Sequence, residues 1–137
     1  MGLSVLAVAG ATLTPPAGAS VSASRCRAVP TALTTVLRAG LSFPSGAKIR
    51  VARAVASRAR PQLYFISLAF TAAELKGHTL IGTWATNDLT SSATVVAIDA
   101  TARAHSDWAQ PDPGAGNVSM RTDGALASRK CVAARLR

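Results

Sequence analysis

Three residues with the side chains of a hydrolytic enzyme stand next to one another: His105, Ser106 and Asp107. A catalytic Ser-His-Asp set needs its hydroxyl, imidazole and carboxylate in line, and these groups normally come from separate segments of a chain. The sequence also lacks the G-x-S-x-G turn that presents a nucleophilic serine. We therefore interpret the three residues as the polar end of a helix that faces water.

Metal binding and acid–base catalysis find no better support. The second histidine, His78, is distant in sequence from His105, and no His/Cys spacing typical of a metal site occurs. The acidic residues stand singly, at positions that read as turns and helix starts. They are Glu74, Asp88, Asp99, Asp107, Asp112 and Asp123. We expect no catalytic residue, no metal, no cofactor and no enzymatic activity.

The two tryptophans, Trp84 and Trp108, form a candidate ligand surface. Side by side, they would make an aromatic wall for a sugar or a peptide. The alternative is that the two largest side chains of an alanine-rich chain fill the space between sheet and helices. We favour this second interpretation.

Positive charge gathers in one part of the chain, which has a net charge of +9. Residues 1–73 contain no acidic residue, and the segment 48–60 contains five basic ones. This candidate anion-binding set is Lys48, Arg50, Arg53, Arg58 and Arg60. Such a cluster would bind phosphates in a salt-dependent way, but the segment has no aromatic residue with which to stack on bases. The simpler explanation is a solvated strand face, with Lys48, Arg50 and Arg58 on one side and Arg53 on the other.

The two cysteines, Cys26 and Cys131, lie near the ends of the segment 24–137. In an oxidising compartment, two lone cysteines at such positions predict a structural disulfide. A redox pair or a metal pair is the alternative, but neither a C-x-x-C spacing nor histidine partners accompany them.

The first residues resemble a secretory signal peptide. An apolar run over residues 3–13 is followed by Pro15-Pro16 and by two small-x-small sites at residues 17–19 and 21–23. No basic residue precedes the run, so the signal is either shortened at its start or weak, and a disordered tail is the alternative. The run is too short and too interrupted to span a membrane. We expect a signal peptide over residues 1–23, a single domain over 24–137, and secretion or attachment to the cell envelope.

Hydrophobic periodicity then organises the domain. Strands joined by short turns favour antiparallel pairing, so the expected fold is α+β. We predict a single antiparallel sheet of about four strands with helices packed on one face, in the order α-β-β-β-β-α-α. Strands are expected at 48–58, 62–71, 79–86 and 93–98, and helices at 30–39, 99–108 and 125–134. The segment 48–58 also fits a helix.

Four short motifs stand between residues 63 and 108: Tyr64-Phe65-Ile66, Gly82-Thr83-Trp84-Ala85-Thr86-Asn87, Ala97-Ile98-Asp99 and His105-Ser106-Asp107-Trp108. Together with Cys26 and Cys131, they resemble those of a group of small secreted actinobacterial proteins with a Trp-Ala-Thr-Asn strand and paired terminal cysteines. The resemblance implies a secreted or envelope-facing α+β domain and no particular activity. The basic segment is not part of it.

Three classes of function follow from these observations. The favoured one is a small binding or interaction domain whose partner is an envelope or extracellular macromolecule. The alternative is a binder of nucleic acid or of another anionic polymer that uses residues 48–60, with nucleic acid the less favoured of the two. An enzyme comes last, because no constellation of residues supports one.

Overall fold

The computed structural model describes residues 25–111 and 118–137, which form one antiparallel sheet and three α-helices. The sheet order is β1-β2-β3-β4-β5, so each strand pairs with its predecessor in the chain. The strands are β1 (Arg27–Ala28), β2 (Lys48–Ala56), β3 (Tyr64–Thr71), β4 (Leu80–Thr86) and β5 (Val95–Ala97). The helices are α1 (Thr31–Ala39), α2 (Ala100–His105) and α3 (Ala125–Arg135), with a short 3₁₀ turn, η2 (Ala73–Leu75). The predicted α+β class and single antiparallel sheet are confirmed.

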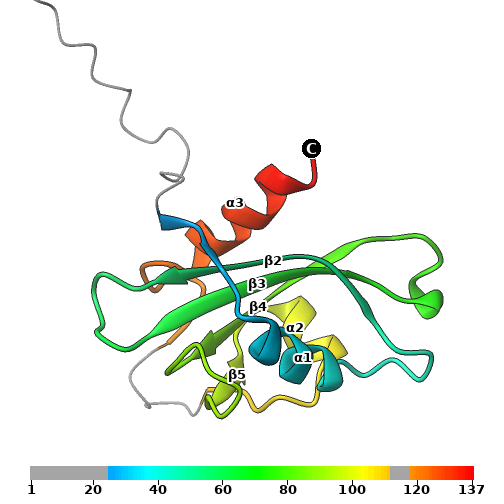
Figure 1. Cartoon of the computed structure of the whole chain (residues 1–137), viewed down its shortest axis with the longest axis horizontal. Coiled ribbons are helices and arrows are strands. Elements are labelled where there is room, and N and C mark those ends of the chain that lie inside the picture. The colour runs from blue at the N-terminus through cyan, green and yellow to red at the C-terminus, as the bar shows by residue number, and fades with distance from the viewer. Residues whose placement is uncertain (1–24, 112–117) are drawn as a thin grey trace, which may run out of the picture.

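Helices cover both faces of the sheet, with α3 on one side and α1 and α2 on the other (Figure 1). The reason lies in β3, whose side chains are apolar on both faces. Leu68 packs in a buried cluster with Leu37 of α1, whereas Phe65 packs with Ala125 of α3. A strand that is apolar on both faces has to be covered on both. The prediction that all helices lie on one face is therefore wrong.

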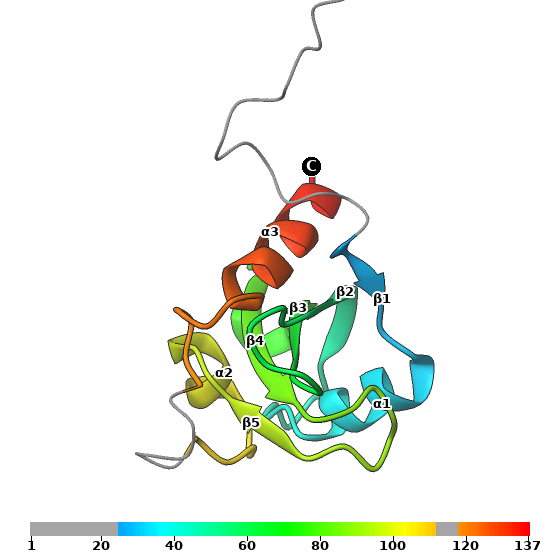
Figure 2. The same ribbon diagram turned by 90° about the vertical axis from the view of Figure 1, so that its left-hand side faces the viewer.

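The first strand, β1, has only two residues, too few to leave a pattern in the sequence. It pairs with the outer edge of β2 through Arg27 opposite Ala54 and Ala28 opposite Arg53, and Figure 2 shows it at that edge of the sheet. The predicted disulfide is confirmed: Cys26, which precedes β1, is bonded to Cys131 of α3, with their Cα atoms 5.7 Å apart. The predicted signal peptide lies outside the described residues.

The basic segment forms a strand, as predicted, but its side chains are not arranged as predicted. Pairing with β3 shifts register between Ile49 and Val51, so Arg50 has no partner and forms a β-bulge. Lys48 is opposite Thr71 and Arg53 is opposite Ser67, two positions that share a face of β3. The bulge therefore puts Lys48 and Arg53 on the same face of the sheet, and the predicted separation of the two is wrong.

The second helix is shorter than its predicted range of 99–108. Asp99 accepts a hydrogen bond from the Ala102 N–H (2.8 Å), as a helix N-cap should, but the helix ends at His105 and Ser106 is extended. Ser106 instead forms a β-bridge with Leu41, which ties the end of α2 to the segment that follows α1. Among the described residues, no helix is both long and apolar enough to cross a membrane.

Candidate anion-binding groove

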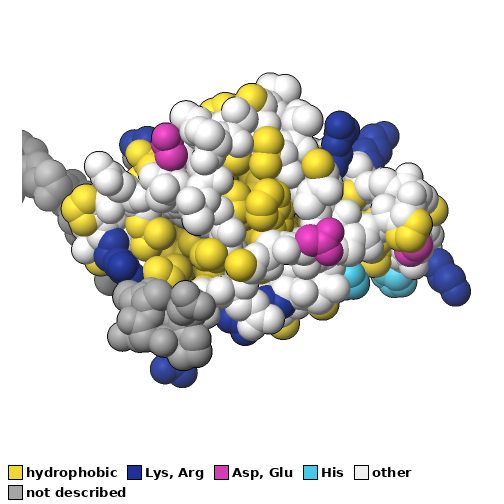
Figure 3. All heavy atoms as spheres, turned by 90° about the horizontal axis from the view of Figure 1, so that it is seen from below, with side chains coloured by type: hydrophobic (Ala, Val, Ile, Leu, Met, Phe, Trp, Pro, Cys, Tyr) yellow, Lys and Arg dark blue, Asp and Glu magenta, His cyan; other side chains and the backbone are white. Residues whose placement is uncertain are grey.

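The tryptophans belong to the core. Trp84 is completely buried, and its indole N–H donates to the Ser106 hydroxyl (3.2 Å). Trp108 packs against the same cluster and lies directly over Gly40. On the face formed by α1, α2 and β5, the visible hydrophobic atoms lie near the middle and the Lys and Arg side chains toward the edges (Figure 3). The structure therefore does not support the candidate ligand surface and favours the gap-filling interpretation of this pair.

The three adjacent polar residues also have separate structural roles. The His105 ring stacks on Phe43, with the ring centroids 5.4 Å apart, and Asp107 accepts a hydrogen bond from the Ser42 hydroxyl (2.8 Å). The Ser106 hydroxyl donates to the Ala102 carbonyl within α2. These contacts hold the chain after α1 against the end of α2, and they point the three side chains toward different partners.

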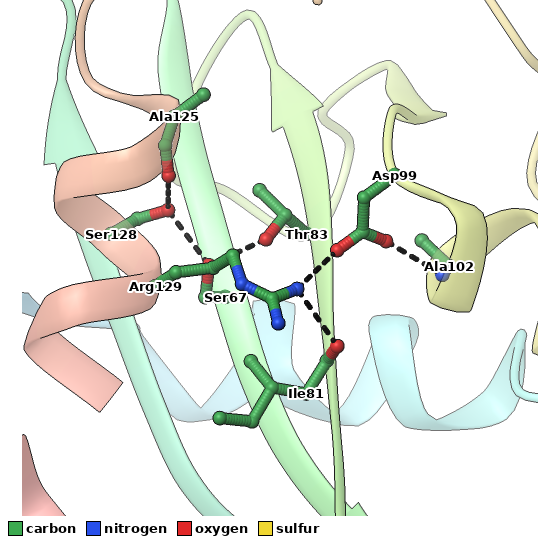
Figure 4. A network of polar contacts seen from close by, with 8 residues as sticks. All are labelled: Ser67, Ile81, Thr83, Asp99, Ala102, Ala125, Ser128 and Arg129. Atoms are coloured by element: carbon green, nitrogen blue, oxygen red, sulfur yellow. Dashed lines mark hydrogen bonds and ion pairs between the residues drawn. The ribbon is translucent and has the colours of Figure 1, made fainter. Parts of the chain in front are cut away.

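A buried polar network joins α3 to the sheet, and it was not anticipated from the sequence (Figure 4). The hydroxyl of Ser67 in β3 lies 2.8 Å from that of Thr83 in β4 and 2.7 Å from that of Ser128 in α3. All three side chains are completely buried, and Ser128 also donates to the Ala125 carbonyl (2.8 Å). We call Ser67, Thr83 and Ser128 the hydroxyl seam. Because all three hydroxyls have hydrogen-bond partners, the seam holds α3 on the sheet and is not a site open to a ligand.

An ion pair extends the network to the start of α2. The Arg129 guanidinium donates to Asp99 (2.7 Å) and to the Ile81 carbonyl (3.2 Å). Asp99 therefore caps one helix and pairs with another, which links α2, β4 and α3. The predicted helix-start role of Asp99 is confirmed, and its second role depends on a contact that local sequence does not reveal.

Two other carboxylates hold loops. Asp123 accepts the Arg58 backbone N–H (2.7 Å) and pairs with Arg25 (3.2 Å). The backbone hydrogen bond from Arg58, with a smaller contribution from Arg25, holds the pKa of Asp123 below its ordinary value, while partial burial opposes this. Glu74 accepts from both the N–H (3.0 Å) and the hydroxyl (2.6 Å) of Ser45, and the hydroxyl bond lowers the pKa of Glu74. No metal-binding group of three is found in the described part of the chain, and Asp112 lies outside it.

Three neighbouring hollows form a groove that begins at the outer edge of β2 beside Arg135 of α3 and then passes alongside α1. Each hollow shares lining residues with the next. The first, of about 400 Å³, is lined by Ala28, Val29, Arg50, Val51, Ala52, Arg53 and Arg135. The second, of about 300 Å³, shares Val29 with the first and is bounded by Ile49 and by the threonines of α1. The third, of about 780 Å³, shares Thr35, Arg38 and Lys48 with the second and reaches the turn at 41–47 and the start of η2.

Of the residues that the structure describes, five cations and no carboxylate line these hollows, which we call the basic groove. The cations are Arg38, Lys48, Arg50, Arg53 and Arg135. The Arg25–Asp123 and Arg129–Asp99 ion pairs use arginines that do not line the groove. The Glu74 carboxylate is held by Ser45 at the wall of the widest hollow. Among the described residues, five cations and one neighbouring carboxylate, Glu74, give the groove a net positive charge.

The structure divides the predicted anion-binding set. Lys48, Arg50 and Arg53 line the basic groove, whereas Arg58 and Arg60 lie at the turn between β2 and β3 and line none of its hollows. Arg38 and Arg135 also line the groove, and the sequence patterns did not identify them as part of a site. The predicted disulfide could have pointed to Arg135. The bond holds Cys131 next to Cys26, which adjoins the strand at the edge of β2, and Arg135 follows Cys131 by one helical turn.

Comparisons with known proteins give no likeness on which to draw. No protein-family model matches the chain, and no curated protein or solved structure is significantly similar to it. The geometry of the basic groove is therefore the guide to function.

Proposed function

We propose that this protein is an exported binding domain that holds an extended anionic chain in the basic groove. The observation that carries the proposal is the series of neighbouring hollows that five cations, and no carboxylate of the described residues, line. Unneutralised like charges in one channel repel one another, and a bound polyanion would relieve that repulsion. A polyanionic ligand agrees with both functions that the sequence suggests, namely binding of an envelope or extracellular macromolecule and binding of an anionic polymer.

The form of the groove favours a linear ligand that is recognised by its charge. From Lys48 to Arg53, β2 rises by roughly 16 Å at about 3.3 Å per residue, long enough for several charged units of a polymer. Among the described residues that line the groove, Phe43 alone is aromatic, and it already stacks on His105. Sequence-independent binding of single-stranded nucleic acid uses aromatic platforms for the bases. An anionic chain without bases therefore fits the groove better than nucleic acid does.

An oxidising location completes the proposal. The Cys26–Cys131 disulfide is of the kind that persists outside the cytosol. The signal-like residues 1–23 and the resemblance to secreted actinobacterial proteins support the same location, so we place the protein outside the cell or at its envelope. The ligand is then an envelope or extracellular polyanion.

The test uses inorganic polyphosphate as the probe, titrated at low and at physiological salt. The groove variant is Lys48→Ala/Arg50→Ala/Arg53→Ala, and the control Arg103→Ala/Arg121→Ala/Lys130→Ala removes the same residue types from exposed positions elsewhere. We expect the groove variant to bind more weakly, and the slope of its log affinity against log salt concentration to become shallower by roughly one per residue removed, while the control stays near wild type. Equal loss in both variants, or no binding by the wild type at low salt, would overturn the proposal.

A further inference from the structure

The outer edge of β2 is open along most of its length. β1 covers it only at Ala54 and Arg53, where it pairs through Arg27 and Ala28. Among the described residues, no strand pairs with this edge from Lys48 to Ala52. No turn or loop of the described residues forms a backbone hydrogen bond with these five residues either. An open edge offers unpaired N–H and C=O groups to another chain.

The hydrogen-bond pattern identifies which groups face outward. The Ser57 N–H donates to the Leu63 carbonyl (2.9 Å), and in an antiparallel pair such bonding residues alternate along the strand. Arg53 and Val51 therefore bond to β3, while Ala52 between them turns its N–H and C=O to the outer edge. In agreement, the Arg53 guanidinium reaches the Ala52 carbonyl from that side (2.9 Å). Ala52 is the first outward-facing residue that β1 does not pair with, and an added strand would take the place of the Arg53 guanidinium at its carbonyl.

The open edge is also one wall of the basic groove. Val51 and Ala52 line the first hollow together with Val29 and Arg135 of α3, and Ile49 lines the second together with Val29 and α1. A groove between a helix and an unpaired strand edge is a geometry that accepts an extended peptide as an added strand. Main-chain hydrogen bonds then supply affinity, and alternate side chains supply specificity.

Charge decides which strand can be added. A second copy of β2 would bring Lys48, Arg50 and Arg53 against the same residues, and this repulsion disfavours self-association. A strand with acidic side chains at alternate positions would place them on one side, toward these cations and Arg135. Resting on the proposed function, we propose that the anionic ligand of the basic groove is an acidic polypeptide segment of about five or six residues, which pairs with the outer edge of β2 as an additional strand.

The probe that tests this is a blocked hexapeptide of alternating Glu and Thr. Its comparison peptide has the same sequence and charge but carries N-methyl groups on alternate backbone nitrogens, which prevents strand pairing. We expect the unmodified peptide to bind and to slow amide hydrogen exchange at Ala52. We expect N-methylation to weaken binding by about tenfold or more, which is the loss of about 1.4 kcal/mol.

A backbone variant separates strand pairing from charge. Ala52→Pro removes the outward N–H and keeps every cation, and proline is tolerated in an edge strand where its missing donor faces solvent. Ala52→Ser retains the N–H and serves as the matched control. We expect Ala52→Pro to lose the peptide and still bind polyphosphate, while Ala52→Ser binds both. If Ala52→Pro fails to fold, the two peptides on the wild-type protein decide the question.

The outcomes of the two proposals are distinct. If polyphosphate binds and the hexapeptide does not, or if both peptides bind equally well, strand addition is wrong and the proposed function stands. If neither polyphosphate nor peptide binds at low salt, the proposed function fails as well.

Discussion

Cys26 and Cys131 are bonded to each other across 105 residues of sequence, and their bond joins the edge of the sheet to the helix that covers it. Cys26 adjoins β1, which lies on β2, and Cys131 lies in the middle of α3. Because Arg135 follows Cys131 by one helical turn, the same bond holds Arg135 beside Arg50 and Arg53. The disulfide thus contributes to the basic groove as well as to the fold.

Replacing both cysteines, Cys26→Ser/Cys131→Ser, is expected to lower the free energy of unfolding by roughly 4–5 kcal/mol. The reason is the large loop that the bond closes, which restricts the unfolded chain. Urea denaturation of the variant and of the oxidised wild type measures the difference, with reduced wild type as the control. An unchanged unfolding midpoint in the variant would contradict the prediction.

The hydroxyl seam beneath α3 gives a second prediction. Ser67→Ala removes the group that bonds both Thr83 and Ser128, leaving buried hydroxyls with fewer partners, so we expect a loss of about 1–3 kcal/mol of stability. Ser67→Ala/Ser128→Ala should cost less than the sum of the two single changes, because each removes a partner of the other. Strict additivity in chemical denaturation would show that the hydroxyls do not act together.

Part of the fold was predictable because the pattern is local. A few neighbouring residues are enough to predict the strands β3 and β4 and the helix cap at Asp99. The covering of both faces was not predicted, although Phe65 and Leu68 show that β3 is apolar on both. A two-residue strand such as β1 depends on its partner and leaves no periodic signal at all.

The candidate site was only partly predictable for a similar reason. Residue type alone identified Lys48, Arg50 and Arg53, but a single bulged residue changed their faces, and a bulge has no local signature here. Arg38 enters the groove through tertiary packing and was out of reach of spacing arguments, whereas the spacing of Arg135 from Cys131 could have pointed to it. The hydroxyl seam depends in the same way on residues from three elements, β3, β4 and α3.

The contact between Gly40 and Trp108 gives a third prediction. A Cβ atom at Gly40 would overlap the Trp108 indole, so Gly40→Ala forces the ring to move and should cost about 1–3 kcal/mol. The control is Gly40→Ala in a Trp108→Leu background, where the smaller side chain leaves room and the added cost should be lower. Thermal unfolding of the four proteins in the cycle measures this, and an equal cost in both backgrounds would rule out the contact as the cause.

Acid should weaken the junction between the β2–β3 turn and the start of α3, where Asp123 accepts the Arg58 N–H and pairs with Arg25. Because these contacts lower the folded-state pKa of Asp123, its stabilisation is present above its ordinary pKa of 3.8 and is lost as the pH falls below that value. Asp123→Asn should therefore be less stable than wild type at neutral pH, and the difference should shrink as the pH falls through the lowered pKa.

Denaturation at a series of pH values tests this, with Arg58→Ala as the control. That variant keeps the backbone N–H that is the largest cause of the lowered pKa of Asp123, so its acid response should follow that of wild type. If Asp123→Asn differed from wild type by the same amount at neutral pH and well below pH 3.8, the charge of Asp123 would not be what stabilises the turn.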